Sequence, residues 1–342
     1  MQRICIIFLF VGINSNVFSQ EQADTLQSDY ILRYPDYFFV WPVLKRKSLN
    51  FNVSDKKEDE SIDYKPNNSY TVGLGAYVFD LALELTFAIP INEKDKKTFG
   101  ESKVRDFQIN ALSSKWGGDL YYQKYTGFYE DDGSYYPDNK PYPQRSDITS
   151  KNFGLTGLYV FNEKKFSARS AFNFSERQLK RGGSWLLTGT VNSFKLKADS
   201  AVVSAKYRNI IGGGSSFEEL RYTTFSIAPG YAYNFIYRKF FLSGALMLGP
   251  AHNWTYYKEE DQPEKNDIGI NLFTSSRVGV GYSDDRFFAG INFVVQSRVV
   301  RFEDIRVSNS TSTFRFLVGY RFREFGILKK SIWDFPKELL NL

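Results

Sequence analysis

The chain is 342 residues long and carries a formal net charge of +6, with one cysteine, one histidine and an aromatic share of 18%. A single cysteine excludes an internal disulfide framework, and a single histidine excludes zinc motifs that need two. The hydrophobic share of 42% is slightly below the value of about 45–50% that is typical of soluble proteins, so a large soluble core does not explain the aromatic excess.

Residues 1–19 are predicted to form a secretory signal peptide. A positive charge at Arg3 precedes a short apolar run, and small residues precede an expected cut after Ser19. The run is too short to cross a bilayer as a helix, and its flanks are those of an export signal. Because Cys5 lies inside this segment, we expect the mature chain to contain no thiol.

Residues 20–46 are predicted to form an N-terminal periplasmic or plug-like segment. The segment contains Pro35 and Pro42, and proline is disfavoured in a central strand because it lacks an N–H group. The basic run 45–47 is expected to flank the barrel on its periplasmic side, next to lipid headgroups.

Residues 47–322 are predicted to form an all-β fold, a single closed antiparallel transmembrane β-barrel. Short runs alternate apolar and polar residues with the period of two that a strand requires. Several runs exceed the roughly ten residues that cross a membrane at a tilt, and aromatic girdles would account for the many Phe and Tyr residues. The candidate strands are 47–54, 69–79, 81–90, 104–113, 119–129, 151–162, 166–177, 184–197, 201–209, 221–236, 239–253, 267–282, 285–299 and 311–322.

Fourteen strands make short and long connections alternate along the chain, as they do in outer-membrane barrels. This count depends on 201–209 being a strand. If it belongs to a long loop, twelve strands remain as the alternative, reached by also dropping another strand, most simply the first.

The last candidate strand shows the two faces of the barrel most clearly. Phe314, Phe316 and Phe322 point to one face, whereas Arg315 and Arg321 point to the other. A lipid-facing Arg at mid-bilayer would cost about 2–4 kcal/mol, so the arginines are expected to face the lumen. The same reasoning predicts these lumen-lining residues: Glu84, Asp106, Arg169, Arg177, Arg277, Arg298, Arg315 and Arg321.

Residues 323–342 are predicted to form a C-terminal periplasmic tail. A barrel commonly ends on an aromatic residue, and Phe322 meets that expectation, but an apolar-rich segment follows it. The tail is expected to pack on the periplasmic rim or to enter the lumen.

Several stretches resemble a family of Gram-negative outer-membrane proteins catalogued as domain of unknown function 4421. They are 30–42, 64–67, 121–129, 142–147, 159–167, 176–178 with 182–184, and 230–234. The resemblance extends over nearly the whole mature chain. It implies a barrel in the outer membrane, and it carries no activity and no catalytic residues.

Three functions are compatible with this pattern. The first is a pore or channel for small solutes, anionic ones included, lined by the luminal arginines. The second is a closed structural or surface-interaction barrel that acts through its loops or tail. The third and most remote is an outer-membrane lipid hydrolase using His252, although no serine lies two residues away.

We therefore expect a non-enzymatic protein of the Gram-negative cell outer membrane, porin-like in architecture. No catalytic, cofactor-binding or metal-binding residue is assigned; acidic loop stretches at 130–138 and 259–267 are interpreted as solvated loop tips. The expected partners are outer-membrane lipid, the barrel-assembly machinery during biogenesis and a small-molecule solute, and no nucleic acid is expected.

Overall fold

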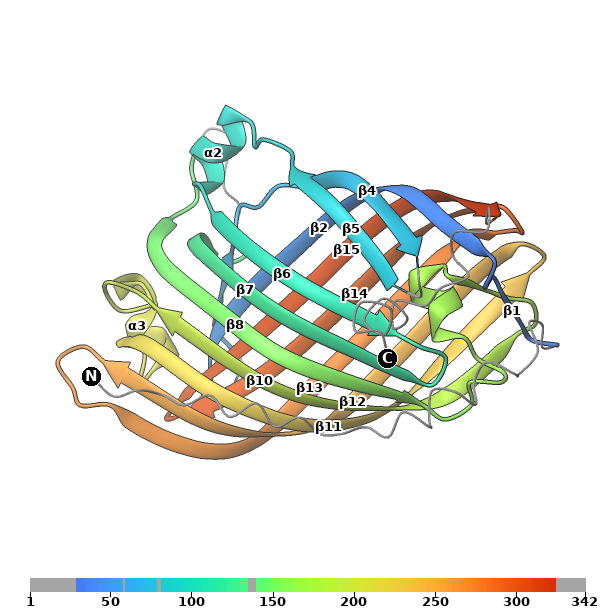
Figure 1. Ribbon diagram of the computed structural model, residues 1–342. Coiled ribbons are helices and arrows are strands. Elements are labelled where there is room, and N and C mark those ends of the chain that lie inside the picture. Colours follow the sequence, from blue (N-terminus) through green and yellow to red (C-terminus); the bar gives the residue numbers. More distant parts are fainter. Residues whose placement is uncertain (1–28, 58, 79–80, 135–139, 324–342) are drawn as a thin grey trace, which may run out of the picture.

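The computed structural model describes residues 29–57, 59–78, 81–134 and 140–323. The predicted signal peptide 1–19 and nearly all of the predicted tail 323–342 lie outside the described residues. Within the described residues, one tilted antiparallel sheet of thirteen strands wraps into a barrel, with helices and irregular segments at both ends and a separate two-stranded sheet at one of them (Figure 1).

The regular elements are long strands and a few short helices. In chain order they are β1 (Ile31–Arg33), β2 (Tyr37–Asp55), β3 (Ser61–Lys65), β4 (Thr71–Val78), β5 (Leu81–Ala88), α2 (Glu93–Phe99), β6 (Lys103–Leu112), β7 (Trp116–Asp131), β8 (Gln144–Val160), the π-helix η2 (Arg169–Asn173), β9 (Glu176–Gln178), β10 (Gly182–Lys197), α3 (Ala205–Ile211), β11 (Phe217–Tyr237), β12 (Phe240–Glu259), β13 (Lys265–Ser283), β14 (Phe287–Phe302) and β15 (Ile305–Arg323).

A closed ring of ten strands forms the barrel wall. The order around it is β2, β15, β14, β13, β12, β11, β10, β8, β7 and β3, and β3 returns to β2. The closing pair joins β2 to β15 in antiparallel register from Ile305 opposite Asp55 to Arg323 opposite Tyr37. Closure leaves the ring with no free edge, which is how a sheet satisfies its backbone hydrogen bonds in a membrane.

Three further strands of the sheet branch from this ring. β3 and β4 pair in succession with the same edge of β2, separated by an irregular segment that begins at Pro66. β5 continues the sheet from β4, and β6 pairs with β7. Among the described residues no ladder joins β5 to β6, although the two strands follow one another in the chain.

The predicted counts of fourteen and twelve strands are not matched by a ring of ten with three strands outside it. Two candidate strands are wrong. The segment 166–177 contains η2 and most of the short strand β9, and 201–209 leads into α3. Both segments have apolar side chains that pack inside the barrel ends, and a period of two does not distinguish such packing from a strand.

The barrel wall begins before residue 47, because β2 starts at Tyr37. Pro42 therefore lies within a strand of the ring, contrary to the expectation from its missing N–H. The reason is local. Trp41 and Pro42 have no partner in the ladder between β2 and β15, so Pro42 does not need an N–H group to donate to β15.

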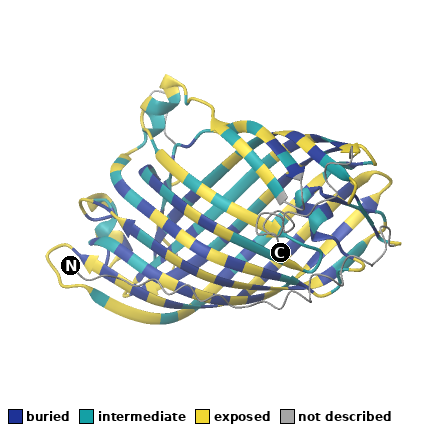
Figure 2. Cartoon of the chain, in the orientation of Figure 1, coloured by how far each residue is buried: buried dark blue, intermediate teal, exposed yellow. Residues whose placement is uncertain are grey.

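Apolar clusters fill both ends of the barrel. At the end that carries α3, rings such as Phe51, Tyr64 and Phe217 pack with Val202 and Val203 from the segment before the helix. At the end that carries β1, Tyr34, Trp41 and Phe174 pack with residues of β12, β14 and β15. Buried and exposed residues alternate along most strands between these ends (Figure 2).

Phe174 is held in a strained backbone conformation at the β1 end. Its φ of 61° lies in the left-handed region, which costs a non-glycine residue about 1–2 kcal/mol. Its ring is 1% exposed, lies 5.4 Å from the Phe241 ring, and occupies space that a side chain at Gly290 would fill. Packing of the ring offsets the backbone strain.

Two substitutions of Phe174 should separate the stabilisation from ring packing from the cost of the backbone strain. Phe174→Ala keeps the strain and loses the ring, so we expect a loss of about 3–5 kcal/mol in unfolding free energy. Phe174→Gly loses the same ring but relieves the strain, and should be about 1 kcal/mol more stable than the alanine variant. Guanidinium unfolding of detergent-refolded protein measures both, with the exposed Phe287→Ala as the control. Equal stability of wild type and Phe174→Ala would contradict this assignment.

Candidate functional site

The middle of the lumen contains a continuous hydrogen-bonded network. Arg298, 1% exposed, donates to the Tyr121 hydroxyl at 2.9 Å, and Asn192 donates to the same hydroxyl at 3.2 Å. Asn192 also donates to Asn152 at 2.7 Å, and Asn152 donates to Gln123 at 2.8 Å. These side chains come from β7, β8, β10 and β14, so the network crosses the lumen.

The network continues to an ion pair. Gln123 donates to Asp106 at 2.8 Å, and Lys47 of β2 donates to the other oxygen of the same carboxylate at 2.6 Å. Tyr125 contributes a third bond to Asp106 at 3.1 Å. Asp106 is therefore tied to β2 and β7 and is not presented to a passing solute.

A second charged cluster is centred on Glu84 of β5. Its carboxylate pairs with Lys45 and with Arg315, and it accepts a hydrogen bond from the Trp41 indole at 3.0 Å. The side chains of Glu84, Lys45 and Arg315 are only 14%, 17% and 14% exposed. Two cations thus depend on one carboxylate in a site with little water.

The remaining predicted lumen residues also have partners. Arg277 pairs with Asp119 at 3.2 Å, and Arg169 pairs with Glu176 at 3.6 Å. Arg177 lies at the β1 end and pairs with Asp285, in the turn after β13, at 2.6 Å.

Arg321 closes the β1 end of the lumen. It donates to the carbonyl oxygens of Asp284 and Phe174 at 2.6 and 2.9 Å. Its guanidinium also lies 4.4 Å from the ring centre of Tyr34 and 4.6 Å from that of Phe288.

Sequence reasoning missed the cations that neutralise the luminal carboxylates. Lys45 and Lys47 were expected to flank the barrel on its periplasmic side, but β2 passes through them and both point inward. The available signal was the alternation Trp41, Val43, Lys45, Lys47 and Leu49, which continues the inward face of β2.

Removing the Glu84 charge should destabilise the barrel strongly. Glu84→Gln leaves Lys45 and Arg315 without an anion, and loss of one partner of a buried ion pair costs about 3–5 kcal/mol. Adding Lys45→Met should recover part of the loss, because only Arg315 then lacks an anion. Guanidinium midpoints of refolded protein measure both variants, and an unchanged midpoint for Glu84→Gln would show that the cluster is not stabilising.

The connection between β10 and β11 covers the α3 end of the lumen. Tyr64 and Arg145 donate to the carbonyl oxygen of Val202 at 2.8 and 2.7 Å. Ser204 donates to the Glu130 carboxylate. These contacts fix the segment 198–204 against β3, β7 and β8, so it forms part of the closed end.

Asp132, at the start of the loop after β7, anchors α3. Its carboxylate accepts hydrogen bonds from the Tyr207 hydroxyl and from the Ser134 backbone N–H, the latter at 3.0 Å, and Lys206 lies at 3.3 Å. The bond from Tyr207, together with the other donors, holds the pKa of the Asp132 carboxyl well below its usual value. The contact therefore contributes stability above the unfolded pKa of about 3.9 and loses it as pH falls below that value.

Asp132→Asn should loosen α3 at neutral pH. The amide loses the charge that holds Lys206 and accepts weakly from Tyr207, so trypsin should cleave after Lys206 and Arg208 several-fold faster than in the wild type. Timed proteolysis of folded protein at pH 8 tests this, with the exposed Asp59→Asn as a matched control. Equal cleavage rates in all three proteins would show that Asp132 does not anchor the helix.

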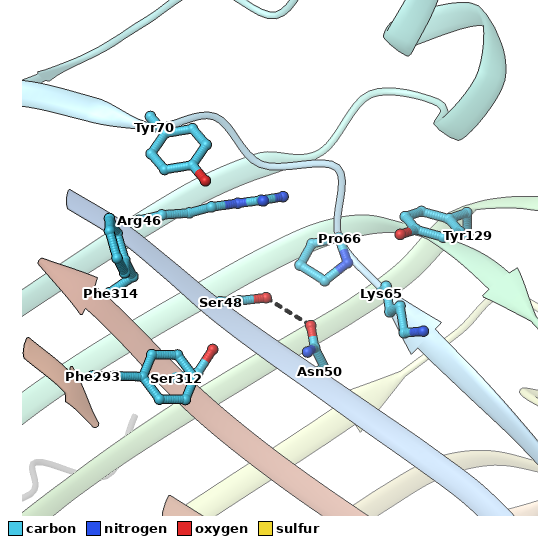
Figure 3. A pocket seen from close by; sticks show the side chains of 10 residues that line it. All are labelled: Arg46, Ser48, Asn50, Lys65, Pro66, Tyr70, Tyr129, Phe293, Ser312 and Phe314. Atoms are coloured by element: carbon cyan, nitrogen blue, oxygen red, sulfur yellow. Dashed lines mark hydrogen bonds between the residues drawn. The ribbon is translucent and has the colours of Figure 1, made fainter. Parts of the chain in front are cut away.

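A groove of about 350 Å³ lies on the outward side of the wall, beside the break between β3 and β4. Its floor includes Ser48, which donates to Asn50 at 2.6 Å, and Arg46 lies 5.2 Å from the ring centre of Tyr70. Figure 3 shows Arg46 extended beside Tyr70, with Phe314 of β15 next to Arg46. Neither a histidine nor a carboxylate is among the lining residues, and the lining lysine, Lys65, is engaged by Asp131 at 2.7 Å.

His252 lies elsewhere, on the outward face of β12. Its cross-strand neighbours are Phe225 and Ile270, and its ring contacts Trp254 edge to face with centres 4.4 Å apart. None of the described residues forms a hydrogen bond with its imidazole. The arrangement provides neither a nucleophile nor an orienting carboxylate, which the hydrolase hypothesis requires.

The described residues contain neither a metal-binding cluster nor a membrane-spanning helix. No group of three or more His, Cys, Asp or Glu side chains is placed to hold a metal ion. No helix in the same part of the chain is both long and apolar enough to span a membrane.

Comparison with known proteins identifies a family. Residues 22–322 match the model described as Domain of unknown function (DUF4421), which confirms the resemblance drawn from the sequence. No curated protein matches the chain.

Solved structures with a similar architecture include the outer-membrane protease OmpT of Escherichia coli, at 10% identity and a TM-score of 0.40, covering 86% of this chain and 99% of that one. Ail, the attachment invasion locus protein of Yersinia pestis, matches at 15% identity and a TM-score of 0.22, covering 61% of this chain and 97% of that one. The toluene transporter TodX of P. putida matches at 8% identity and a TM-score of 0.25, covering 85% of this chain and 91% of that one.

Proposed function

Because the chain belongs to the DUF4421 family, whose description assigns no activity, we propose from its geometry that the protein is a closed outer-membrane barrel. In this proposal it passes no solute and acts through its outer wall and surface loops. The observation that carries the proposal is the burial of luminal side chains in the middle of the barrel and at both of its ends.

The outward face supports a membrane location. Large apolar side chains are exposed on neighbouring strands, and a soluble monomer rarely exposes a contiguous apolar patch beyond a few hundred Å². Examples are Leu85 at 68%, Ile270 at 72% and Trp185 at 64% exposure. A bilayer removes the cost of such a surface, and aromatic residues near its edges suit the two interfaces.

The connections support an orientation. Tight connections such as Arg238–Lys239 and 113–115 lie at the β1 end, whereas the connections with α2 and α3 and the loop after β7 lie at the other end. Outer-membrane barrels place short turns in the periplasm and long loops outside. We therefore assign the β1 end to the periplasm and the α3 end to the cell surface.

The luminal contacts favour closure over passage. One apolar cluster packs at the α3 end, a second packs at the β1 end, and the Arg298 and Glu84 networks lie between them. A selective pore for anions needs cations that are open to water, whereas Arg298 and Arg321 are each 1% exposed. The channel hypothesis is for this reason the weaker one, and the setting of His252 gives the hydrolase hypothesis no support.

Conductance tests the proposal directly. Full-length protein, refolded and shown to be heat-modifiable, should give no discrete current steps in a planar bilayer. A known porin inserted in the same bilayers controls for sensitivity. Reproducible single-channel steps that scale with protein concentration would overturn closure, and their anion selectivity would then support the channel hypothesis.

A further inference from the structure

Three basic side chains stand directly opposite one another on the outer wall. Arg105 of β6 is paired in register with Lys124 of β7, and Lys124 is paired with Lys151 of β8. Their chain neighbours Gln123 and Asn152 point into the lumen, so Lys124 and Lys151 point outward. None of the three cations forms an ion pair with any described residue. We call Arg105, Lys124 and Lys151 the cationic row.

The neighbouring strands show how unusual this row is. In register beyond Lys151 lie Lys195 of β10 and Arg221 of β11. Lys195 pairs with Glu219 at 2.6 Å, and Arg221 pairs with Glu264 at 2.6 Å and with Glu219 at 3.3 Å. Like charges directly opposite one another destabilise a sheet. Repulsion within the cationic row therefore destabilises the sheet, and no acidic residue of the described structure offsets it. A bound external anion would offset this repulsion.

Two apolar rows lie next to the cationic row. One step toward the β1 end, Phe107, Tyr122 and Phe153 stand opposite one another, and one step further lie Ile109, Leu120 and Leu155. All six are exposed, from 37% for Leu120 to 59% for Phe107. Successive rows on one face are about 6.6–6.8 Å apart, so charge gives way to aromatic and then aliphatic surface over little more than ten ångströms.

We propose that the cationic row binds the phosphate groups of an outer-leaflet lipid, a phosphorylated and multiply acylated glycolipid of the lipopolysaccharide class. The cations match the phosphates in charge, Arg105 offers a planar donor pair, and the two apolar rows receive the sugar–acyl boundary and the acyl chains. This inference rests on the proposed membrane location and orientation, which place the row at the outer-leaflet interface.

Binding of defined lipids to refolded, detergent-solubilised full-length protein tests the assignment. The probes are bis-phosphorylated lipid A, the same lipid without phosphates, and inorganic phosphate. The triple variant Arg105→Gln/Lys124→Gln/Lys151→Gln should bind phosphorylated lipid A at least tenfold more weakly than the wild type. The charge-matched control Lys56→Gln/Lys94→Gln/Lys97→Gln, whose cations are exposed at the same end of the barrel, should bind it normally.

Two results would overturn the inference. One is equal binding of phosphorylated lipid A by the triple variant and the wild type. The other is binding of inorganic phosphate at the row as tight as that of the lipid, which would identify a soluble anion as the ligand. Weak binding of the dephosphorylated lipid to the wild type would support the role of the phosphates.

A second variant keeps the test valid if the triple variant does not fold. Lys124→Gln removes the central charge alone and should weaken lipid binding several-fold. In lipid-free detergent the same variant should unfold at an equal or higher denaturant concentration, since a repulsion is relieved; a lower midpoint would indicate a structural role and contradict the inference. Conductance of the same preparations is independent of this outcome, so failure of the lipid site and failure of closure are distinguishable.

Discussion

When a sheet closes into a barrel, its inward polar side chains must form hydrogen bonds or ion pairs with one another. Every second residue of each strand faces the same narrow interior, and an unpaired charge there would lose its hydration without compensation. The structure answers with pairs across the lumen: Glu84 meets Lys45 and Arg315, and Asp106 meets Lys47. Closure of β2 onto β15 places Arg315 opposite Lys45, so that Glu84 of β5 can meet both cations.

The same pairs hold the irregular part of the wall. β5 and β6 share no ladder among the described residues, yet Glu84 belongs to β5 and Asp106 to β6. Both carboxylates reach cations of β2, and Glu84 also reaches β15. Interior ion pairs therefore link to the ring two strands that do not pair with each other. The luminal charges first suggested a path for solutes. Their ion pairs instead attach β5 and β6 to the rest of the barrel.

The alternation of residues predicted the barrel, because a period of two is a local property. In β15, Phe316 and Phe322 are exposed on the outward face, whereas Arg315 and Arg321 make their contacts inside the barrel. The same alternation predicted strands wrongly where the chain folds into the lumen. Phe166 and Phe172 are spaced as in a strand, but Phe172 belongs to the π-helix η2 and Phe166 to the irregular segment before it. β3, only five residues long, is too short for its alternation to be recognised.

Whether the lumen is filled was beyond the sequence, since it depends on which charges meet across the ring and on where the ends fold. Cysteine labelling tests that filling most directly, and the only natural cysteine is Cys5. Thr190→Cys places a thiol at a luminal position that is 1% exposed. The account predicts that a water-soluble maleimide labels it only after unfolding, whereas rapid labelling of the folded protein would mean a water-filled lumen and would contradict the account.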